Sequence, residues 1–485
     1  MDLKILFEPF ENIEIDALAL IGFEQTAQAH PWIAELTQSG EFSGKLHDLV
    51  ILHHPTELKA NRLVAVGGGK ADKFTPSQMR RLAGGVVRQL KAKSIKRIGL
   101  VLSEAFQYPD FVAAAAEGAM VGNWDPGALK TKRDDIKAAD EFVLLCPGGP
   151  QELARAFDRG RTIGDAQNLA RDLANEPPNA LTPRAMAVQC KALADECGLA
   201  CDVLDADRMR QLGMGALLGV AQGSAEPPQL IVLSYTPSQA PRASHHLGLV
   251  GKAVTFDTGG ISIKPSENMD RMKFDMAGGA AMVGAMLAIA QLKPGIPVTA
   301  FIPAVENMPG GKAQRPGDIV KSMAGLTVEI LNTDAEGRLI MADAMTYAKR
   351  QGVTHLVDAA TLTGAVVMAL GAVNSGVFSN NDEFQRRVVD VARGQGEKVW
   401  PMPMDDEYRE MLKSHYADLP NIGSKGAGAV TAAKFLQEFA GDTPWVHFDI
   451  AGTAWIDDAK PHMAAGPTGV GVRTFTQLAL QWDSL

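Results

Sequence analysis

The sequence predicts an α/β protein of more than one domain. Its 485 residues are enough for two or three domains of ordinary size. Short apolar runs of strand length alternate with longer segments of helical periodicity, an order typical of helices packed on a sheet. Hydrophobic residues make up 46% and charged residues 21% of the chain, which excludes a disordered protein.

Residues 1–150 are expected to form an N-terminal α/β domain. The apolar runs 49–52, 62–66 and 98–102 predict short buried strands, and 77–91 predicts a helix with Pro76 before it. A glycine-rich turn follows the second strand, but it lacks the residues that a phosphate-binding loop requires at positions 64 and 71.

A long helix is expected to connect this domain to a larger one. The Pro and Gly residues of 147–150 interrupt the chain, and 152–174 then shows helical periodicity without Pro until Pro177 ends it. We therefore assign a linker helix to 151–175 and a second domain to 176–485. Its candidate strands in one central sheet are 230–233, 247–250, 298–302, 328–331 and 356–357.

Composition indicates a cytoplasmic protein without a membrane segment. The N-terminus lacks the basic flank of a signal peptide, and the longest apolar runs, such as 280–290, are shorter than the roughly 20 residues that cross a bilayer. The four Cys residues form no Cys-x-x-Cys pair and are interpreted as reduced thiols. Acidic residues outnumber basic ones, 56 to 47, which argues against nucleic acid as the main partner.

Asp334 and Glu336 are the first candidate functional residues. They follow a strand-like run and precede a helix-like one, 339–350. In an extended segment Asn332, Asp334, Glu336 and Arg338 would project together, at the strand end where open α/β sheets place ligands. Taken alone, an Asp-x-Glu pair is more often a loop that caps the next helix.

Asp257 and Asp275 add two more carboxylates at neighbouring element ends. Asp257 closes the strand around 254–256 before a Gly-Gly turn, and Asp275 precedes an apolar helix. Each could be an ordinary turn or capping residue. Together with Asp334 and Glu336 they would repel one another strongly unless cations intervene, and two divalent ions would balance the four charges. Oxygen ligands of this kind suit Mg, Mn or Zn.

Three basic residues accompany these carboxylates. Lys252 lies within an apolar strand. One interpretation is that it pairs with a carboxylate. The other is that it binds metal as a neutral amine, which requires that burial and the ion depress its pKa. Lys264 could stabilise a developing oxyanion, and Arg338 could hold an anion through two hydrogen bonds. The sequence contains neither His-Glu-x-x-His nor Gly-x-Ser-x-Gly, which disfavours a zincin and a serine hydrolase. His447 is interpreted as a core residue.

The segments around these residues resemble the active-site motifs of the leucyl aminopeptidase family (cytosol aminopeptidase, peptidase family M17). The resemblance covers 176–485 and is weaker over 1–150. It is carried by 250–252, 256–265, 272–276, 332–339, 358–365 and 449–452.

The resemblance implies the role of each site residue. Lys252, Asp257, Asp275, Asp334 and Glu336 would bind two ions, Mn or Zn with Mg as an alternative in the more exchangeable site, and Asp257 and Glu336 would serve both. Lys264 and Arg338 would be catalytic, and Arg338 would position a bicarbonate that acts as base to a metal-bridging water. Residues that would hold the substrate or line its first pocket are Met272, Thr361, Leu362, Gly364 and Ala451.

The resemblance also implies an N-terminal macro-like domain, a catalytic domain with a central mixed sheet, and a homohexamer. The activity would be release of N-terminal residues, Leu or Met preferred, from peptides. Two alternatives remain open. One is a non-enzymatic role in which the N-terminal domain binds DNA or a regulator. The other is a different dimetal amidase or a phosphoesterase.

Overall fold

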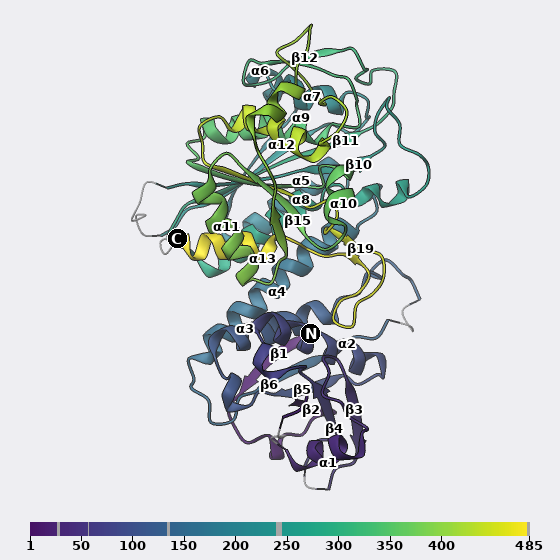
Figure 1. The fold of residues 1–485 in the computed structure, drawn as a ribbon, viewed down its shortest axis with the longest axis vertical. Coiled ribbons are helices and arrows are strands. Elements are labelled where there is room, and N and C mark those ends of the chain that lie inside the picture. The colour runs from purple at the N-terminus through teal and green to yellow at the C-terminus, as the bar shows by residue number, and fades with distance from the viewer. Residues whose placement is uncertain (27–29, 57, 133–135, 239–244, 483–485) are drawn as a thin grey trace. The chain divides into compact units, whose positions relative to one another are not determined.

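The computed structural model describes residues 1–26, 30–56, 58–132, 136–238 and 245–482, and it confirms the predicted α/β fold class. Contacts between residues divide the chain into two compact units (Figure 1). The first contains 1–168 and 457–466, and the second contains 169–456 and 467–485. The division falls inside the long helix α4 (Leu153–Asn175), which matches the helix expected over 152–174. The domain boundaries 1–150, 151–175 and 176–485 stay a prediction.

The first unit is built on a six-stranded mixed sheet with strand order β1-β6-β5-β2-β4-β3. All pairs are parallel except β3 with β4. The three strands predicted from apolar runs are β3, β4 and β5. The strands are β1 (Asp2–Leu6), β2 (Ala17–Gly22), β3 (Leu49–His53), β4 (Arg62–Gly67), β5 (Arg97–Val101) and β6 (Glu141–Leu145).

Helices cover both faces of this sheet. Ala17 and Ala19 of β2 share an apolar cluster with α2 (Pro76–Ala92) and α3 (Pro109–Asn123). Leu18 and Leu20 share a second cluster with α1 (Pro31–Ser39), because alternate residues of a strand point to opposite faces. The predicted helix 77–91 corresponds to α2, which Thr75 opens as N-cap in a capping box with Gln78.

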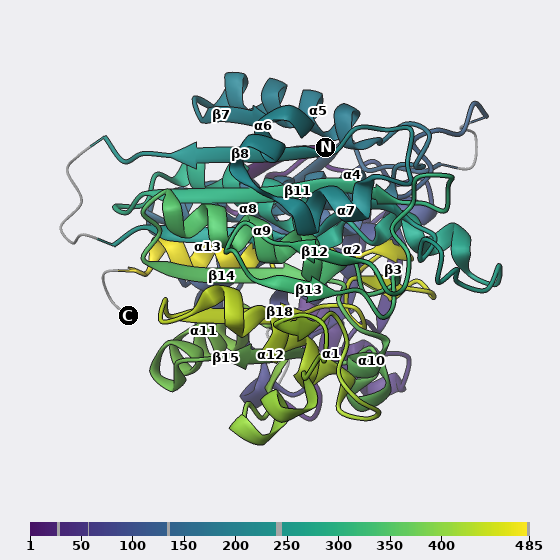
Figure 2. The ribbon, with the colours of Figure 1, turned by 90° about the horizontal axis from the view of Figure 1, so that it is seen from above.

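The second unit contains a nine-stranded mixed sheet with order β16-β15-β18-β14-β9-β11-β8-β7, and β10 pairs with the end of β11. Figure 2 shows β7, β8, β11, β14, β18 and β15 following one another in this order. The strands are β7 (Ala200–Leu204), β8 (Gln229–Tyr235), β9 (Leu247–Gly251), β10 (Ala253–Asp257), β11 (Val298–Asn307), β14 (His355–Ala360), β15 (Ser375–Ser379), β16 (Val399–Pro401) and β18 (Trp445–Asp449).

Two groups of helices enclose this sheet (Figure 1). One group packs together as α6 (Ala206–Leu212), α7 (Gly215–Ala221), α9 (Gly337–Arg350), α10 (Gly364–Leu370) and α12 (Gly428–Ala440). The other consists of α5 (Pro183–Cys197), α8 (Ala277–Leu292), α11 (Asp382–Gly394) and α13 (Val472–Leu480). Among the described residues one helical segment, Met269–Leu292, is long and apolar enough to cross a membrane. However, 89% of its apolar 18-residue window is buried inside the fold, as in a helix of a protein core.

The expectation that 328–331 belongs to the central sheet is wrong. Residues Thr327–Glu329 form β13, which pairs with β12 (Ile319–Lys321) and β17 (Leu419–Pro420) in a separate three-stranded sheet. An apolar run predicts a strand but not its partners, and β13 is a short strand in which only Val328 is buried. The other four predicted strands lie in the central sheet as β8, β9, β11 and β14.

Candidate metal centre

Lys252 lies at an interruption between two strands. It separates β9 from β10, and both strands pair in parallel with successive parts of β11. The break is fixed by the backbone, because the Lys252 amide donates to Ala359 O at 3.1 Å and its carbonyl accepts from Gly279 N at 2.7 Å. Lys252 is 3% exposed, so its amine lies in the interior of the unit at the end of β9.

Asp257 ends β10, and its carboxylate is held by groups that face it from the turn and from β11. Its Oδ1 accepts from Gly259 N at 2.9 Å and from Asn307 Nδ2 at 2.8 Å. Gly259 has φ +85°, and a Cβ atom there would lie 2.8 Å from Asp334 Oδ1. The glycine therefore both makes the turn and lets the two carboxyl-bearing segments approach each other.

Asp275 enters the site between a 3₁₀ turn, Met269–Phe274, and α8. Its Oδ1 accepts a hydrogen bond from Thr361 Oγ1 at 2.7 Å. The Thr361 carbonyl in turn accepts from Lys252 Nζ at 3.0 Å. Thr361, expected to contact substrate, thus orients two of the expected metal ligands through its hydroxyl and carbonyl groups.

Asp334 and Glu336 reach the site by a route different from the predicted one. The segment is a turn, not an extended strand, since Ala335 N donates to Asn332 O and Glu336 has helical φ and ψ of −78° and −37° at the start of α9. The side chain of Asn332 instead turns back to the chain, and its Oδ1 accepts a hydrogen bond from Asp334 N at 2.9 Å. The prediction that Asn332, Asp334, Glu336 and Arg338 project together from an extended segment is therefore wrong, although Asp334 and Glu336 do meet.

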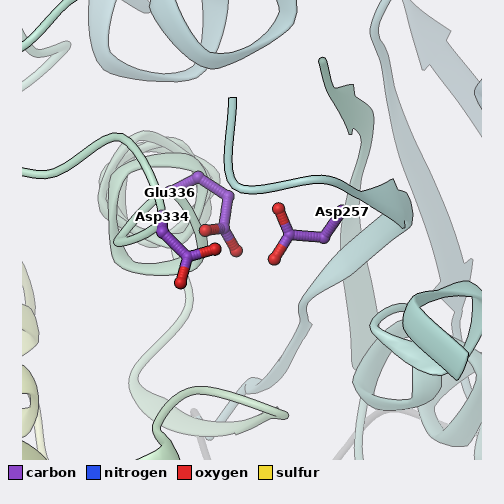
Figure 3. Close-up of side chains that lie close together, drawn as sticks. All are labelled: Asp257, Asp334 and Glu336. Atoms are coloured by element: carbon purple, nitrogen blue, oxygen red, sulfur yellow. The ribbon is translucent and has the colours of Figure 1, made fainter. Parts of the chain in front are cut away.

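Figure 3 shows Asp257, Asp334 and Glu336 turned toward one another. One carboxylate oxygen from each lies within 4.8 Å of the others, an arrangement that could hold a metal ion. Within the part of the chain that the structure describes, Glu336 Oε2 is buried and has no hydrogen-bond partner. An unsatisfied buried carboxylate oxygen beside two other carboxylates fits a cation ligand.

Two lysines join the four carboxylates into one charged cluster. Lys252 Nζ lies 2.8 Å from Asp275 Oδ2 and 2.7 Å from Glu336 Oε1. Lys264 Nζ lies 2.8 Å from Asp257 Oδ2 and also pairs with Asp334. The structure thus brings together all six of these predicted residues. Each lysine bridges two carboxylates, and four acids against two amines leave an excess of negative charge.

This excess of acidic groups governs the pKa values in the cluster. Burial lowers the pKa of Lys252, but Asp275, Glu336 and Asp257 outweigh it and raise that pKa above its ordinary value. The pKa of Lys264 is raised in the same way, with Asp257 as the largest opposing charge. The protein's own groups therefore work against the neutral amine that metal binding by Lys252 requires, and only a bound cation could supply the predicted depression.

The pKa values of Asp275, Asp334 and Glu336 are raised above their ordinary values. Burial raises the pKa of Asp275, against the lowering effect of Lys252. Burial, with the nearby charge of Asp257, raises the pKa values of Asp334 and Glu336. Because metal ligands must be deprotonated, cation binding here is expected to release protons.

Arg338, in the first turn of α9, is 7% exposed, and Nη1 donates to Asn421 O at 2.8 Å. Its Nε is buried and has no hydrogen-bond acceptor among the described residues. Burial lowers the pKa of Arg338 to about 10, against the attraction of Glu336 and Asp449. A buried guanidinium with a free N–H group can bind an anion.

The remaining predicted site residues lie on segments that border the cluster. Met272 is in the 3₁₀ turn before Asp275, and Gly364 begins α10. The Leu362 and Ala451 amides both donate to Asp449 Oδ1, each at 3.2 Å, so one carboxylate holds these two predicted positions together.

Sequence reasoning assigned no role to Asp449, Asn307 or Asn421, although Asp449 begins one of the segments that resemble the family's motifs. Asp449 also accepts from Thr363 Oγ1 at 2.6 Å, and Asn421 donates to Asn332 O at 2.6 Å. All three are buried and hold the backbone that carries the charged cluster. Of these three residues, only Asp449 has a position in the sequence that indicates a site, because it ends an apolar strand as Asp257 does.

Fold and site together define a metal-dependent hydrolase of the α/β class. The sequence matches the cytosol aminopeptidase family in its catalytic domain over residues 168–476 and in its N-terminal domain over residues 16–133. The chain belongs to the cytosol aminopeptidase family. It is thus a metal-dependent aminopeptidase, an exopeptidase that acts on peptides, as predicted.

Relatives match along the whole chain. A probable cytosol aminopeptidase of Solibacter usitatus (strain Ellin6076) is 56% identical over 100% of both chains. One of Koribacter versatilis (strain Ellin345) is 48% identical over 92% of this chain and 90% of the relative. A mutant of tomato leucine aminopeptidase has a TM-score of 0.88 at 31% identity, covering 99% and 96% of the two chains. The bottromycin maturation enzyme BotP, solved in complex with Mn, has a TM-score of 0.87 at 33% identity, covering 97% and 100%.

Proposed function

We propose that this aminopeptidase binds two divalent ions through Lys252, Asp257, Asp275, Asp334 and Glu336, with Asp257 and Glu336 shared between them. The observation that carries the proposal is the group of buried carboxylates around Glu336, whose Oε2 is unsatisfied among the described residues. Two divalent ions would neutralise the charges of the four carboxylates. Mn is favoured because BotP was solved with it, and Zn suits the same ligands. Mg is an alternative in the exchangeable site.

Lys264 and Arg338 are proposed as the catalytic residues. Divalent ions, when bound, supply a water of lowered pKa and polarise a carbonyl. Lys264, which lies 2.8 Å from Asp257 at the edge of the cluster, could stabilise an oxyanion on the substrate through its ammonium group. The Arg338 Nε group, buried and without an acceptor among the described residues, would hold a bicarbonate that takes a proton from the attacking water.

The substrate's free α-amine is proposed to lie at Asp275, which would limit the reaction to N-terminal residues. Met272, Thr361, Leu362, Gly364 and Ala451 would hold its first residue. Leu362 and Ala451 are partly buried apolar residues next to the core, which supports a preference for Leu or Met side chains. We also propose that the protein is cytoplasmic, like its relatives by name, and that it forms a homohexamer.

The test of the metal site is chelation and a single substitution. Chelated protein should lose hydrolysis of Leu-p-nitroanilide and regain it with Mn or Zn. Glu336→Gln should lower kcat/KM by about 10³ or more, since it removes a shared ligand. The matched control is Glu383→Gln, which removes an exposed acid paired with Arg387 across one helical turn.

Two results would reject the proposal. One is activity that survives both chelation and Glu336→Gln. The other concerns the substrate amine. If an N-acetylated peptide were hydrolysed as fast as the free-amine peptide, Asp275 would have no role in recognising the amine, and a general amidase would be the better description.

A further inference from the structure

A cavity of about 200 Å³ lies within the first unit, remote in sequence from the metal centre. It is bordered by the ends of β2 and β5, by the segment after β6, and by α1. The residues that the argument uses are Leu20, Ile33, Leu102, His30, Ser103 and Glu104. All of the lining residues belong to the first compact unit.

The position of this cavity follows from the strand order. After β2 the chain moves to β3 and β4 on one side of the sheet, whereas after β5 it moves to β6 on the other side. β2 and β5 are parallel neighbours, so the loops that leave their carboxyl ends diverge between them. Open α/β sheets bind ligands at such a switch point, because diverging loops leave a crevice there.

The inner wall of the cavity is apolar. Leu20, Ile33 and Leu102 are 6%, 1% and 0% exposed. An apolar cavity of roughly 150 Å³ is large enough to bind benzene. A volume of about 200 Å³ therefore accommodates one branched or aromatic side chain, but not a nucleotide or a peptide.

Polar groups of opposite character border the same cavity. His30 Nδ1 accepts a hydrogen bond from Trp32 N at 3.3 Å, so the neutral ring carries its proton on Nε2 and can donate. Glu104 is exposed, and its carboxylate pairs with no other described residue. The cavity thus combines an apolar interior with the His30 donor, the Glu104 carboxylate, the Ser103 hydroxyl and the Gln107 side-chain amide.

We propose that the first unit binds one free amino acid with a branched or aromatic side chain in this cavity. The side chain would occupy the apolar interior, Glu104 would bind the ammonium group and His30 the carboxylate. This ligand has the chemistry of the product that an aminopeptidase releases, so the cavity is suited to sense the product. The proposal depends on none of the roles assigned to the metal ligands.

The test is a titration of the full chain, labelled at Ile δ1 methyl groups, with L-leucine and L-phenylalanine. Ile21 and Ile33 line the cavity, and their signals are assigned through Ile21→Val and Ile33→Val. Both signals should shift and saturate. N-acetyl-leucine amide has the same side chain without either charge. Because it loses both charged contacts, it should bind at least about tenfold more weakly than leucine. The local readout separates this site from product bound at the metal centre.

Two variants locate the ligand. Glu104→Gln should weaken leucine binding about tenfold by removing the anionic acceptor. The exposed control Glu152→Gln in the same unit should leave it unchanged. Val101→Phe, which fills part of the cavity, should abolish the shifts, and peptidase activity and melting temperature report whether that variant folds. Shifts that do not saturate by about 50 mM, equal binding of the uncharged amide, or unchanged binding in Glu104→Gln would overturn the proposal.

Discussion

Replacing Gly337 by Ala tests the proposed position of Lys252 without removing a charged group. Gly337 is the first residue of α9, directly after Glu336. A Cβ atom at Gly337 would lie 2.8 Å from Lys252 Cδ and Cε and 2.9 Å from Nζ. Ordinary carbon contacts are about 3.5–4.0 Å, so the amine must move by about 1 Å.

The surroundings of Lys252 make this movement costly for the site. Nζ contacts Asp275 at 2.8 Å, Glu336 at 2.7 Å and the Thr361 carbonyl at 3.0 Å, and a shift of 1 Å cannot preserve all three. A displacement of that size in an active site can cost about 10² in rate, equivalent to about 2.7 kcal/mol of transition-state stabilisation. The helix itself should not weaken, since Ala is the better helix former by about 0.5–1 kcal/mol.

The assay compares Gly337→Ala with Gly394→Ala by kcat/KM, Mn titration calorimetry and thermal denaturation. Gly394 is the last residue of α11, and a Cβ there meets nothing within 4 Å. Gly337→Ala should lose about 10² in kcat/KM and bind Mn more weakly at an unchanged Tm, and the control should match wild type. Full activity and full Mn affinity in Gly337→Ala would refute the claim that the position of Lys252 matters.

Three further predictions concern buried polar groups. Arg338→Lys should lower kcat at least about tenfold and abolish stimulation by added bicarbonate, since an ammonium cannot replace the planar donor; retained stimulation would exclude an anion at this residue. Burial raises the pKa of Asp343 from 3.8 to about 7, against hydrogen bonds from the amides of Leu217 and Met323. An acid with a raised pKa in the folded state contributes stability at low pH that is lost as the pH rises toward 7, so Asp343→Asn should lower Tm more at about pH 5 than at about pH 8. A constant difference in Tm would show that Asp343 does not titrate in this range. Asp449→Asn should raise KM for Leu-p-nitroanilide more than it lowers kcat, because it loosens the predicted substrate positions and leaves the metal ligands in place; equal effects on both would contradict that assignment.

The charged part of the site could be predicted because its residue types are unusual at their positions. Lys252 in an apolar strand, and Asp257 at the end of one, are expensive to bury singly and therefore indicate a partner or an ion. The argument for Asp334 and Glu336 correctly brought them together with Asp257, but it assumed the wrong local geometry. The two-residue period of a strand was assumed, whereas a turn before α9 orients both side chains.

The polar residues that hold the backbone of the site could not be predicted in this way. Asn307 and Asn421 contribute hydrogen bonds to segments that are respectively 50 and 89 residues distant in sequence. An Asn at the end of a strand or in a loop is an ordinary turn residue by every local criterion. Only the pairing of strands shows which backbone group it meets. The same limitation explains why residues 328–331 were wrongly assigned to the central sheet. The partners of β13, β12 and β17, depend on long-range contacts that an apolar run does not reveal.

A buried network beside the site shows why such residues matter for its geometry. Asp358 on β14 accepts from Trp445 Nε1 and pairs with His447 Nδ1, both on β18 and each at 2.5 Å. Asp358 and His447 are also direct partners in the register of these parallel strands. A slip of one residue would leave a buried carboxylate unpaired, at a cost of several kcal/mol, so the network fixes the register. Because the register is fixed, the ends of the two strands present Thr361 and Asp449 at the same edge. There Thr361 forms hydrogen bonds with Asp275 and Lys252, and Asp449 holds the proposed substrate segment. His447 was interpreted as a core residue, and its position in the sheet determines where other residues of the site lie.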